Sequence, residues 1–182
     1  MMRVLMLSGG IDSATVLYSS ESSIDLCMSV YYGQPGHVAE IEAAPSLAAS
    51  LLIPHEVATI RLGAQSSSGI LGGNDETAEA SVVAGRNSAF VALAAMRGAT
   101  TVVLGCNGDD QEHYMDCRAH ILRSVGIACG VSIELPLLQK SKKEIVIMAK
   151  AHQVPLSETV SCYRGSGCGS CAACVARSEA GA

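Results

Sequence analysis

The residues near the N-terminus that are best suited to chemistry form the string Leu7-Ser8-Gly9-Gly10-Ile11-Asp12-Ser13. Its paired glycines let the backbone turn tightly and approach a ligand. N–H groups at the start of a following helix suit a polyphosphate, and the hydroxyls of Ser8 and Ser13 add donors. A carboxylate such as Asp12 beside phosphate requires a bridging cation, for which we expect Mg²⁺. The string predicts a phosphate-binding loop, with a plain strand-to-helix turn as the alternative.

Four cysteines near the C-terminus form a second candidate site, with the spacing Cys162-x5-Cys168-x2-Cys171-x2-Cys174. Four thiolates match the tetrahedral shell of Zn²⁺, and the glycines between them permit the turns that such a site needs. An iron–sulfur cluster uses similar spacing, and a redox dithiol would need only two of the cysteines. We favour structural zinc, because the segment offers four ligands and no redox motif accompanies it.

The other four of the eight cysteines, Cys27, Cys106, Cys117 and Cys129, are scattered singly through apolar segments. They are expected to be small buried hydrophobic residues. Clustered Cys-x-x-Cys spacing, in a sequence whose N-terminus resembles a core strand more than a signal peptide, favours a metal site in a reducing compartment. We therefore expect a cytoplasmic protein.

The elements that must position these sites alternate between buried strands and helices. This alternation predicts an α/β fold with a Rossmann-like parallel sheet, helices on both faces and ligands beyond the carboxyl ends of the strands. A capping box of Ser141 and Glu144 marks the start of the last long helix. The expected strands are 4–7, 26–31, 56–60, 101–104 and 131–135, and the expected helices are 13–20, 38–52 with an interruption or kink at Pro45, 87–97, 116–125 and 141–151.

Composition excludes several classes of protein. Of the 182 residues, 49% are hydrophobic and 16% are charged, which excludes an intrinsically disordered chain. No apolar run is long enough for a membrane helix. The net charge of −5 argues against direct binding to nucleic acid. We predict one domain over residues 1–182, with residues 159–182 as its metal-binding C-terminal segment.

A polar, glycine-rich stretch between Arg61 and Gly85 has no clear element of its own. Segments of this length without structure are unusual in compact domains. The sequence leaves two interpretations open, an ordinary surface loop or a lid over the phosphate site.

The Ser-Gly-Gly-x-Asp-Ser string resembles the PP-loop of the ATP pyrophosphatases, which split ATP between its α- and β-phosphates. It lacks the Gly-Lys-Ser/Thr ending of a Walker loop, so transfer of the γ-phosphoryl group is not expected. Further motifs along the whole chain resemble the 7-cyano-7-deazaguanine synthase family. These motifs are Tyr32-Gly33-Gln34, Gly85-Arg86-Asn87, Gly105-Cys106-Asn107-x-Asp109-Asp110, Tyr114-Met115-Asp116-Cys117-Arg118, Ser141-Lys142-x-Glu144 and Ser161-Cys162-Tyr163.

The resemblance implies an ATP-dependent ligase that converts 7-carboxy-7-deazaguanine and ammonia to the nitrile, 7-cyano-7-deazaguanine, through adenylated and amide intermediates. It further implies a homodimer that acts on small molecules in queuosine or archaeosine precursor synthesis, encoded by a bacterium, an archaeon or a phage. Several alternatives remain. A compact variant could stop at the amide or use another acceptor, another PP-loop activity such as tRNA thiolation is conceivable, and so is a non-catalytic nucleotide-binding zinc module.

The resemblance also implies roles for individual residues. Residues 7–13 would bind ATP, with Asp12 and Lys142 near its phosphates. Arginine and aspartate suit the carboxylate and the N–H edge of a deazapurine, respectively. The substrate-binding candidates are Arg86, Asn87, Asp116, Arg118 and Tyr163, and the metal ligands are Cys162, Cys168, Cys171 and Cys174.

Overall fold

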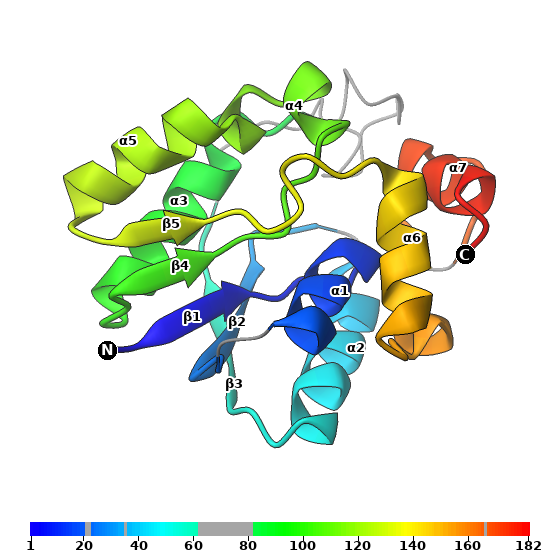
Figure 1. Ribbon diagram of the computed structural model, residues 1–182, viewed down its shortest axis with the longest axis horizontal. Coiled ribbons are helices and arrows are strands. Elements are labelled where there is room, and N and C mark those ends of the chain that lie inside the picture. Colours follow the sequence, from blue (N-terminus) through cyan, green and yellow to red (C-terminus); the bar gives the residue numbers. More distant parts are fainter. Residues whose placement is uncertain (21–22, 35, 62–81, 166) are drawn as a thin grey trace.

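A computed structural model of the chain describes residues 1–20, 23–34, 36–61, 82–165 and 167–182. Its strands form one five-stranded parallel sheet in the order β3-β2-β1-β4-β5 (Figure 1). The strands are β1 (Arg3–Met6), β2 (Leu26–Tyr31), β3 (His55–Thr59), β4 (Thr101–Val103) and β5 (Ser132–Glu134). The predicted α/β class with a parallel sheet is confirmed.

Helices cover both faces of the sheet (Figure 1). On one face lie α1 (Ile11–Ser19), α2 (His37–Ser50) and α6 (Lys142–Ala151), and on the other lie α3 (Arg86–Met96) and α5 (Ala119–Cys129). Two short helices, α4 (Asp110–His113) and α7 (Ala172–Glu179), and two 3-10 turns, Met115–Cys117 and Leu156–Glu158, complete the described elements. Sequence patterning did not predict α4, α7 or the 3-10 turns.

The core is divided by the sheet into two apolar clusters. Leu5 and Leu7 pack with α1, α2 and α6, whereas Val4 and Met6 pack with α3 and α5. Successive side chains of a strand point to opposite faces, so a strand covered on both sides must be apolar throughout. This explains why Val4–Leu7 is a continuous hydrophobic run.

The strand order places the predicted phosphate-binding loop, residues 7–13, between connections that leave β1 toward opposite sides of the sheet. β1 is central, β2 leaves on one side of it and β4 on the other, and ligands of open parallel sheets bind at such a point. The loop after β4 approaches the start of α1 so closely that a Cβ atom on Gly105 would lie 3.1 Å from the backbone nitrogen of Ser13. The two loops therefore form one continuous edge.

Two helix predictions need correction. Helix α2 runs through Pro45 without interruption, and Ala44 and Leu47 beside it are fully buried in the core, which holds the helix in place. The predicted helix 116–125 starts later, at Ala119, since Arg118 has an extended backbone (φ −72°, ψ 132°). Asp116 lies instead in a 3-10 turn, where its carboxylate accepts a hydrogen bond from α3.

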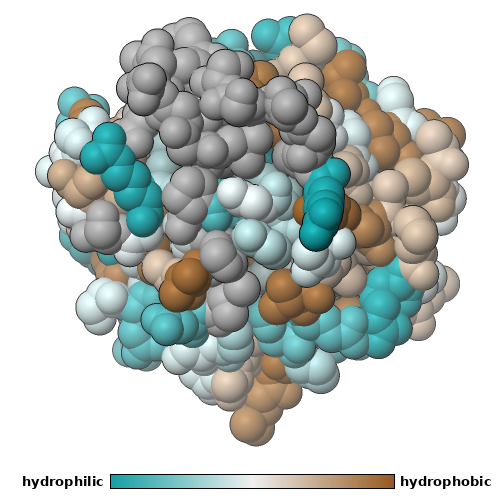
Figure 2. Space-filling model, turned by 180° about the vertical axis from the view of Figure 1, so that it is seen from behind, coloured by the Kyte–Doolittle hydropathy of each residue, from teal (hydrophilic) through white to brown (hydrophobic). Residues whose placement is uncertain are grey.

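On the face shown in Figure 2, hydrophobic residues lie in small groups among hydrophilic ones. The lowest point of that view is the turn between α2 and β3, where Leu52 is 93% exposed. None of the described helices combines the length and the apolar character needed to span a membrane. Residues 62–81, which make up most of the stretch interpreted as a loop or a lid, lie outside the described residues.

Candidate active site and metal centre

The loop after β1 has the geometry expected of a phosphate-binding turn. Gly9 has a positive φ of 79°, and a Cβ atom on it would lie 3.1 Å from Cβ of Ala43, so both its conformation and its packing require glycine. The side chain of Ser13 accepts a hydrogen bond from the backbone N–H of Ser8 (3.2 Å) and donates one to the carbonyl of Gly10 (3.2 Å). These bonds hold the loop in shape before any ligand arrives.

Asp12 and Lys142 form an ion pair at this loop. Lys142 Nζ lies 2.7 Å from Oδ1 and 2.6 Å from Oδ2 of Asp12, and both side chains are largely buried. Asn107, which is 1% exposed, donates from Nδ2 to Oδ2 of the same carboxylate (3.2 Å). Three loops, those after β1, β4 and β5, therefore meet at Asp12.

The start of α6 is fixed by two separate sets of hydrogen bonds. Ser141 and Glu144 form the predicted capping box. Oδ2 of Asp109 accepts the backbone N–H of Lys142 at 2.9 Å. The loop after β4 thus holds both partners of the ion pair, Asp12 through Asn107 and Lys142 through Asp109.

Asp110 is a half-buried carboxylate in the same loop. Its Oδ2 accepts from the backbone N–H of Asn107 (3.3 Å), and its own N–H donates to Oδ1 of Asn107 (2.8 Å). Burial, together with the charge of Asp12, raises the pKa of Asp110 to about 6, and Lys142 opposes the rise. No role was assigned to Asp110 from the sequence, although it lies within a motif that carries the family resemblance.

A second group of residues lies around the start of α3. The backbone N–H of Asn87 donates to Oδ2 of Asp116 (2.8 Å), and its Nδ2 lies 3.2 Å from Sγ of Cys117. The Arg86 guanidinium lies 3.4 Å from Oη of Tyr32. Its Nε is buried with no hydrogen-bond partner among the described residues, so Arg86 has unused capacity to bind an anion.

Aromatic side chains gather beside Arg86 in a chain that has only five tyrosines and one phenylalanine. The rings of Tyr32 and Phe90 are 5.8 Å apart, and Tyr163 and Tyr114 pack against the same cluster. Burial and the neighbouring Tyr163 raise the pKa of the Tyr114 hydroxyl. Flat aromatic faces of this kind suit a planar heterocycle.

The candidate Arg118 is held differently from the other predicted substrate residues. Its Nε donates to the carbonyl of Gln111 at 3.1 Å, which ties the start of α5 to α4. The other four predicted substrate residues lie close together at the edge of the sheet; they are Arg86, Asn87, Asp116 and Tyr163. The hydrogen bond described for Arg118 instead stabilises the elements beside them. Sequence reasoning missed Tyr32 and Tyr114, whose only signal was their place in motifs.

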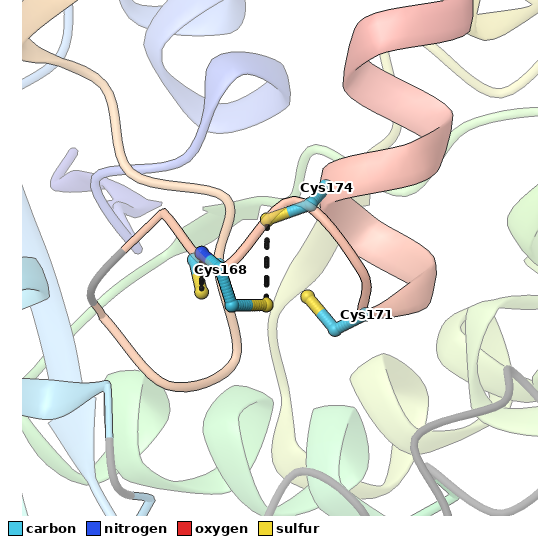
Figure 3. Close-up of side chains that lie close together, drawn as sticks. Cys168, Cys171 and Cys174 are labelled. Atoms are coloured by element: carbon cyan, nitrogen blue, oxygen red, sulfur yellow. Dashed lines mark hydrogen bonds between the residues drawn. The ribbon is translucent and has the colours of Figure 1, made fainter.

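The four C-terminal cysteines come together as predicted. Their Sγ atoms all lie within 4.8 Å of one another, with those of Cys168 and Cys174 at 4.0 Å, and the three labelled side chains of Figure 3 point toward a common centre. Gly165, Gly167 and Gly169 all have positive φ values, which confirms the predicted tight turns. Backbone N–H groups of Ser170 and Cys171 lower the pKa of Cys168 to about 6, which favours the thiolate that binds metals.

The segment leading into this cluster lies against the phosphate loop. The backbone N–H of Val160 donates to the carbonyl of Gly9 at 2.9 Å, and a Cβ atom on Gly10 would lie 3.3 Å from the carbonyl oxygen of Val160. A Cβ atom on Gly36 would lie 3.1 Å from the carbonyl oxygens of Cys162 and Tyr163. The cysteine segment is thus wedged between the loops after β1 and β2.

Known proteins match this chain over nearly its whole length. Residues 2–182 match the family described as queuosine biosynthesis protein QueC. A 7-cyano-7-deazaguanine synthase of Synechococcus is 35% identical, with 97% of this chain and 91% of that protein covered. Another, from Rhizobium johnstonii, is 33% identical over 99% of this chain and 87% of its own length.

Among solved structures, the U34-tRNA thiolase NcsA of Methanococcus maripaludis, solved with its [4Fe-4S] cluster, has the same fold. The TM-score is 0.57 at 19% identity, over 98% of this chain and 64% of the other. At this level of identity the likeness extends to the fold alone.

The raised pKa of Asp110 leads to a prediction about stability. The carboxyl of an aspartate in an unfolded chain has a pKa of about 4. Between pH 4 and 6 the folded protein therefore binds more protons at this residue than the unfolded chain does. The contribution of protonated Asp110 to the free energy of unfolding is therefore fully present below about pH 4, and it is lost as the pH rises to about 6. The variant Asp110→Asn, which is neutral at every pH, should melt at a higher temperature than the wild type above pH 6 and not below pH 4.

Thermal melts followed by circular dichroism across this pH range provide the measurement. Glu179→Gln, an exposed carboxylate at the end of α7, is the control and should give no such gain. A gain for Asp110→Asn that is the same at pH 4 and pH 8 would disprove the assigned titration.

Proposed function

Because the chain belongs to the family of queuosine biosynthesis protein QueC, it converts 7-carboxy-7-deazaguanine and ammonia to 7-cyano-7-deazaguanine with ATP, and we propose here how its residues divide that work. The observation that carries the proposal is that the loop of Ser8–Ser13 and the group around Arg86 and Asp116 belong to the same edge of the sheet. A carboxylate must be activated and then attacked, so ATP and the deazapurine have to bind side by side. The alternatives of a variant stopping at the amide and of a non-catalytic module are not favoured.

The chemistry explains why both substrates are needed in one site. A carboxylate is a poor electrophile until one oxygen becomes a leaving group. Its attack on the α-phosphate of ATP forms an acyl adenylate and releases pyrophosphate, and ammonia then displaces AMP to give the amide. The amide oxygen attacks the α-phosphate of a second ATP and releases a second pyrophosphate, and loss of AMP together with both N–H protons gives the nitrile. The protein supplies position and charge stabilisation.

We assign ATP binding to residues 7–13. The N–H groups at the start of α1 would receive the phosphates, supported by the hydroxyls of Ser8 and Ser13. Lys142, now paired with Asp12, can turn its ammonium group to a phosphate oxygen as a mobile point charge. Carboxylate oxygens are ligands that Mg²⁺ prefers, so Asp12 fits the role of holding Mg²⁺, which would neutralise charge on the departing pyrophosphate.

We assign recognition of the deazapurine to the group around α3. Arg86 would bind the carboxylate of the substrate, a role supported by its buried and unpartnered Nε. Asp116 would accept N–H donors from the base through the oxygen that Asn87 leaves free, and Tyr163 would border the ring. Asn87 would act mainly by positioning Asp116 through its backbone N–H. Arg118 would stabilise the binding site by joining the start of α5 to Gln111 of α4.

We propose Zn²⁺ as the metal of the four cysteines. A zinc ion with four thiolates at about 2.3 Å in a tetrahedron separates the sulfur atoms by about 3.8 Å, close to the 4.0 Å between Cys168 and Cys174. A [4Fe-4S] cluster must place four irons and four sulfides between its ligands, so it requires thiolates much farther apart. Four ligands fill the zinc shell, and the metal would therefore be structural.

We also propose that the protein acts as a homodimer in the cytoplasm and binds no nucleic acid directly. The resemblance to the family motivates the dimer, and the net charge of −5 motivates the absence of nucleic acid as a partner. Free thiols that must stay reduced to hold a metal motivate the compartment.

The first prediction from the proposed function concerns the products of the reaction. Incubation with ATP, ammonium and 7-carboxy-7-deazaguanine should release AMP and pyrophosphate together with the nitrile, measured by mass spectrometry. Asp12→Asn should abolish turnover while the circular dichroism spectrum is unchanged, because the variant loses the charge that holds the cation. The control Asp25→Asn alters a carboxylate that accepts from the N–H of Arg3, far from the loop, and should remain active. ADP and phosphate as the only nucleotide products would refute adenylation.

The second prediction concerns base recognition. Asp116→Asn keeps an acceptor for the N–H of Asn87 but removes the charge presented to the base. It should weaken binding of 7-carboxy-7-deazaguanine by roughly 1–3 kcal/mol and leave ATP binding unchanged. Titration calorimetry with each substrate separately is the measurement. Equal losses for both ligands would mean that Asp116 has only a structural role.

The third prediction concerns the metal. Elemental analysis should find one zinc ion per chain, with no stoichiometric iron or sulfide. Cys171→Ser should lower metal content and melting temperature together, because assembly of the ligands and local folding are coupled. The matched control Cys129→Ser changes a cysteine outside the cluster and should retain the metal. Stoichiometric iron with a visible absorption band would replace zinc by an iron–sulfur cluster.

A further inference from the structure

Arg177, one turn after Cys174 in α7, has a network of hydrogen bonds that the proposed reaction does not use. Its Nη1 donates to the carbonyl (2.9 Å) and the hydroxyl (2.9 Å) of Thr159 and to the hydroxyl of Ser161 (3.3 Å). Its Nη2 donates to the carbonyl of Leu156 at 2.6 Å. The guanidinium is therefore committed to one short stretch of chain, residues 156–161.

That stretch connects directly to the phosphate loop at one point and to the metal cluster at its end. Val160 lies between Thr159 and Ser161, both of which accept hydrogen bonds from Arg177, and its N–H donates to the carbonyl of Gly9. The next residue after Ser161 is Cys162, whose Sγ accepts from the N–H of Cys168 at 3.3 Å. A shift of this stretch would move a backbone partner of Gly9.

Helix α7 begins directly at the cysteine cluster. The helix has eight residues, none of them buried, and Cys171 is its N-cap. A helix this short has little stability of its own and needs external contacts to hold it. Metal binding by Cys171 and Cys174 would fix the first turn of α7 and so place the guanidinium of Arg177.

We propose that Arg177 is a positioning residue that couples the four-cysteine metal site to the phosphate loop, so that metal binding increases the affinity for ATP. The coupling runs from Cys171 and Cys174 through the guanidinium of Arg177 to residues 156–161, and from Val160 to Gly9. By thermodynamic linkage, bound nucleotide increases the affinity for the metal by the same factor. The inference depends on the proposed assignment of ATP to residues 7–13.

The planar fork of arginine is essential to this role. Its two terminal nitrogens donate to Leu156 and Thr159 from one rigid plane, whereas lysine offers a single rotating ammonium group that lacks this planar geometry. Arg177→Lys keeps the positive charge but loses the bridge. This variant separates positioning from a simple attraction between a surface cation and ATP.

The first experiment measures steady-state kinetics and metal content of Arg177→Lys and Arg177→Ala. Both variants should raise KM for ATP about fivefold or more, with KM for 7-carboxy-7-deazaguanine and the zinc content unchanged. Lys150→Ala is the matched control, since Lys150 donates to the carbonyl of Gly181, just beyond the end of α7, and has no described hydrogen bond to residues 156–161. It should leave KM for ATP unchanged.

Two results of this experiment would overturn the inference. A wild-type KM for ATP in Arg177→Lys would mean that charge alone matters. A parallel rise in both KM values, accompanied by loss of zinc, would mean that Arg177 only stabilises the fold.

The second experiment measures the coupling itself by calorimetry with α,β-methylene-ATP, which cannot be split between its α- and β-phosphates. Removal of zinc by a chelator should weaken binding to the wild type about fivefold or more and should change binding to Arg177→Ala much less. An equal loss in both proteins would refute coupling through Arg177. Failure of the proposed function would be evident separately, since the wild type would then release no AMP.

Discussion

The carboxylate of Asp12 and the ammonium group of Lys142 lie 130 residues apart in the sequence and 2.6 Å apart in the structure, and three loops are arranged around their ion pair. Both side chains are about three-quarters to four-fifths buried, at 22–23% exposure, so water screens the pair only partly. Loss of either charge would leave the other uncompensated at the edge of the sheet. Asn107 and Asp109 hold the two partners from the loop after β4, and this loop is therefore part of the candidate phosphate site.

Close backbone contact is the second constraint on the site. The loop after β1 is bounded by α2 at Gly9, and by the C-terminal segment at Gly9 and Gly10. Space for a side chain is lacking at several of these contacts, so glycine is required by packing as well as by conformation. The cysteine segment consequently belongs to the active-site edge, although it follows the last strand by some distance in the chain. The proposed metal there would therefore affect nucleotide binding without touching the nucleotide.

The few aromatic residues of the chain are concentrated in one part of the core. The sheet and helices pack mainly through Val, Leu, Ile and Ala side chains, and the chain has no tryptophan. Tyr32, Phe90, Tyr114 and Tyr163 instead gather in the second cluster, next to Arg86. In a chain so poor in aromatic residues, this grouping marks the place where a flat ligand is expected. It also places the ring of Tyr32 at 6.0 Å from the guanidinium carbon of Arg86.

The sequence by itself determined the parallel α/β sheet, the loop of Ser8–Ser13, the capping box at Ser141 and the four-cysteine segment, because each depends on local spacing or on alternation of apolar residues. The tertiary structure alone decided how these parts combine. The pairing of Asp12 with Lys142, the role of Asn87 in holding Asp116 and the contact of Val160 with Gly9 join residues far apart in the chain. Helix α7 and the start of α5 at Ala119 also escaped sequence analysis, since the clustered cysteines and a hydrogen bond from another helix override local propensity there. Local patterns encode the elements, and only the packing of parallel strands brings their carboxyl ends to one edge.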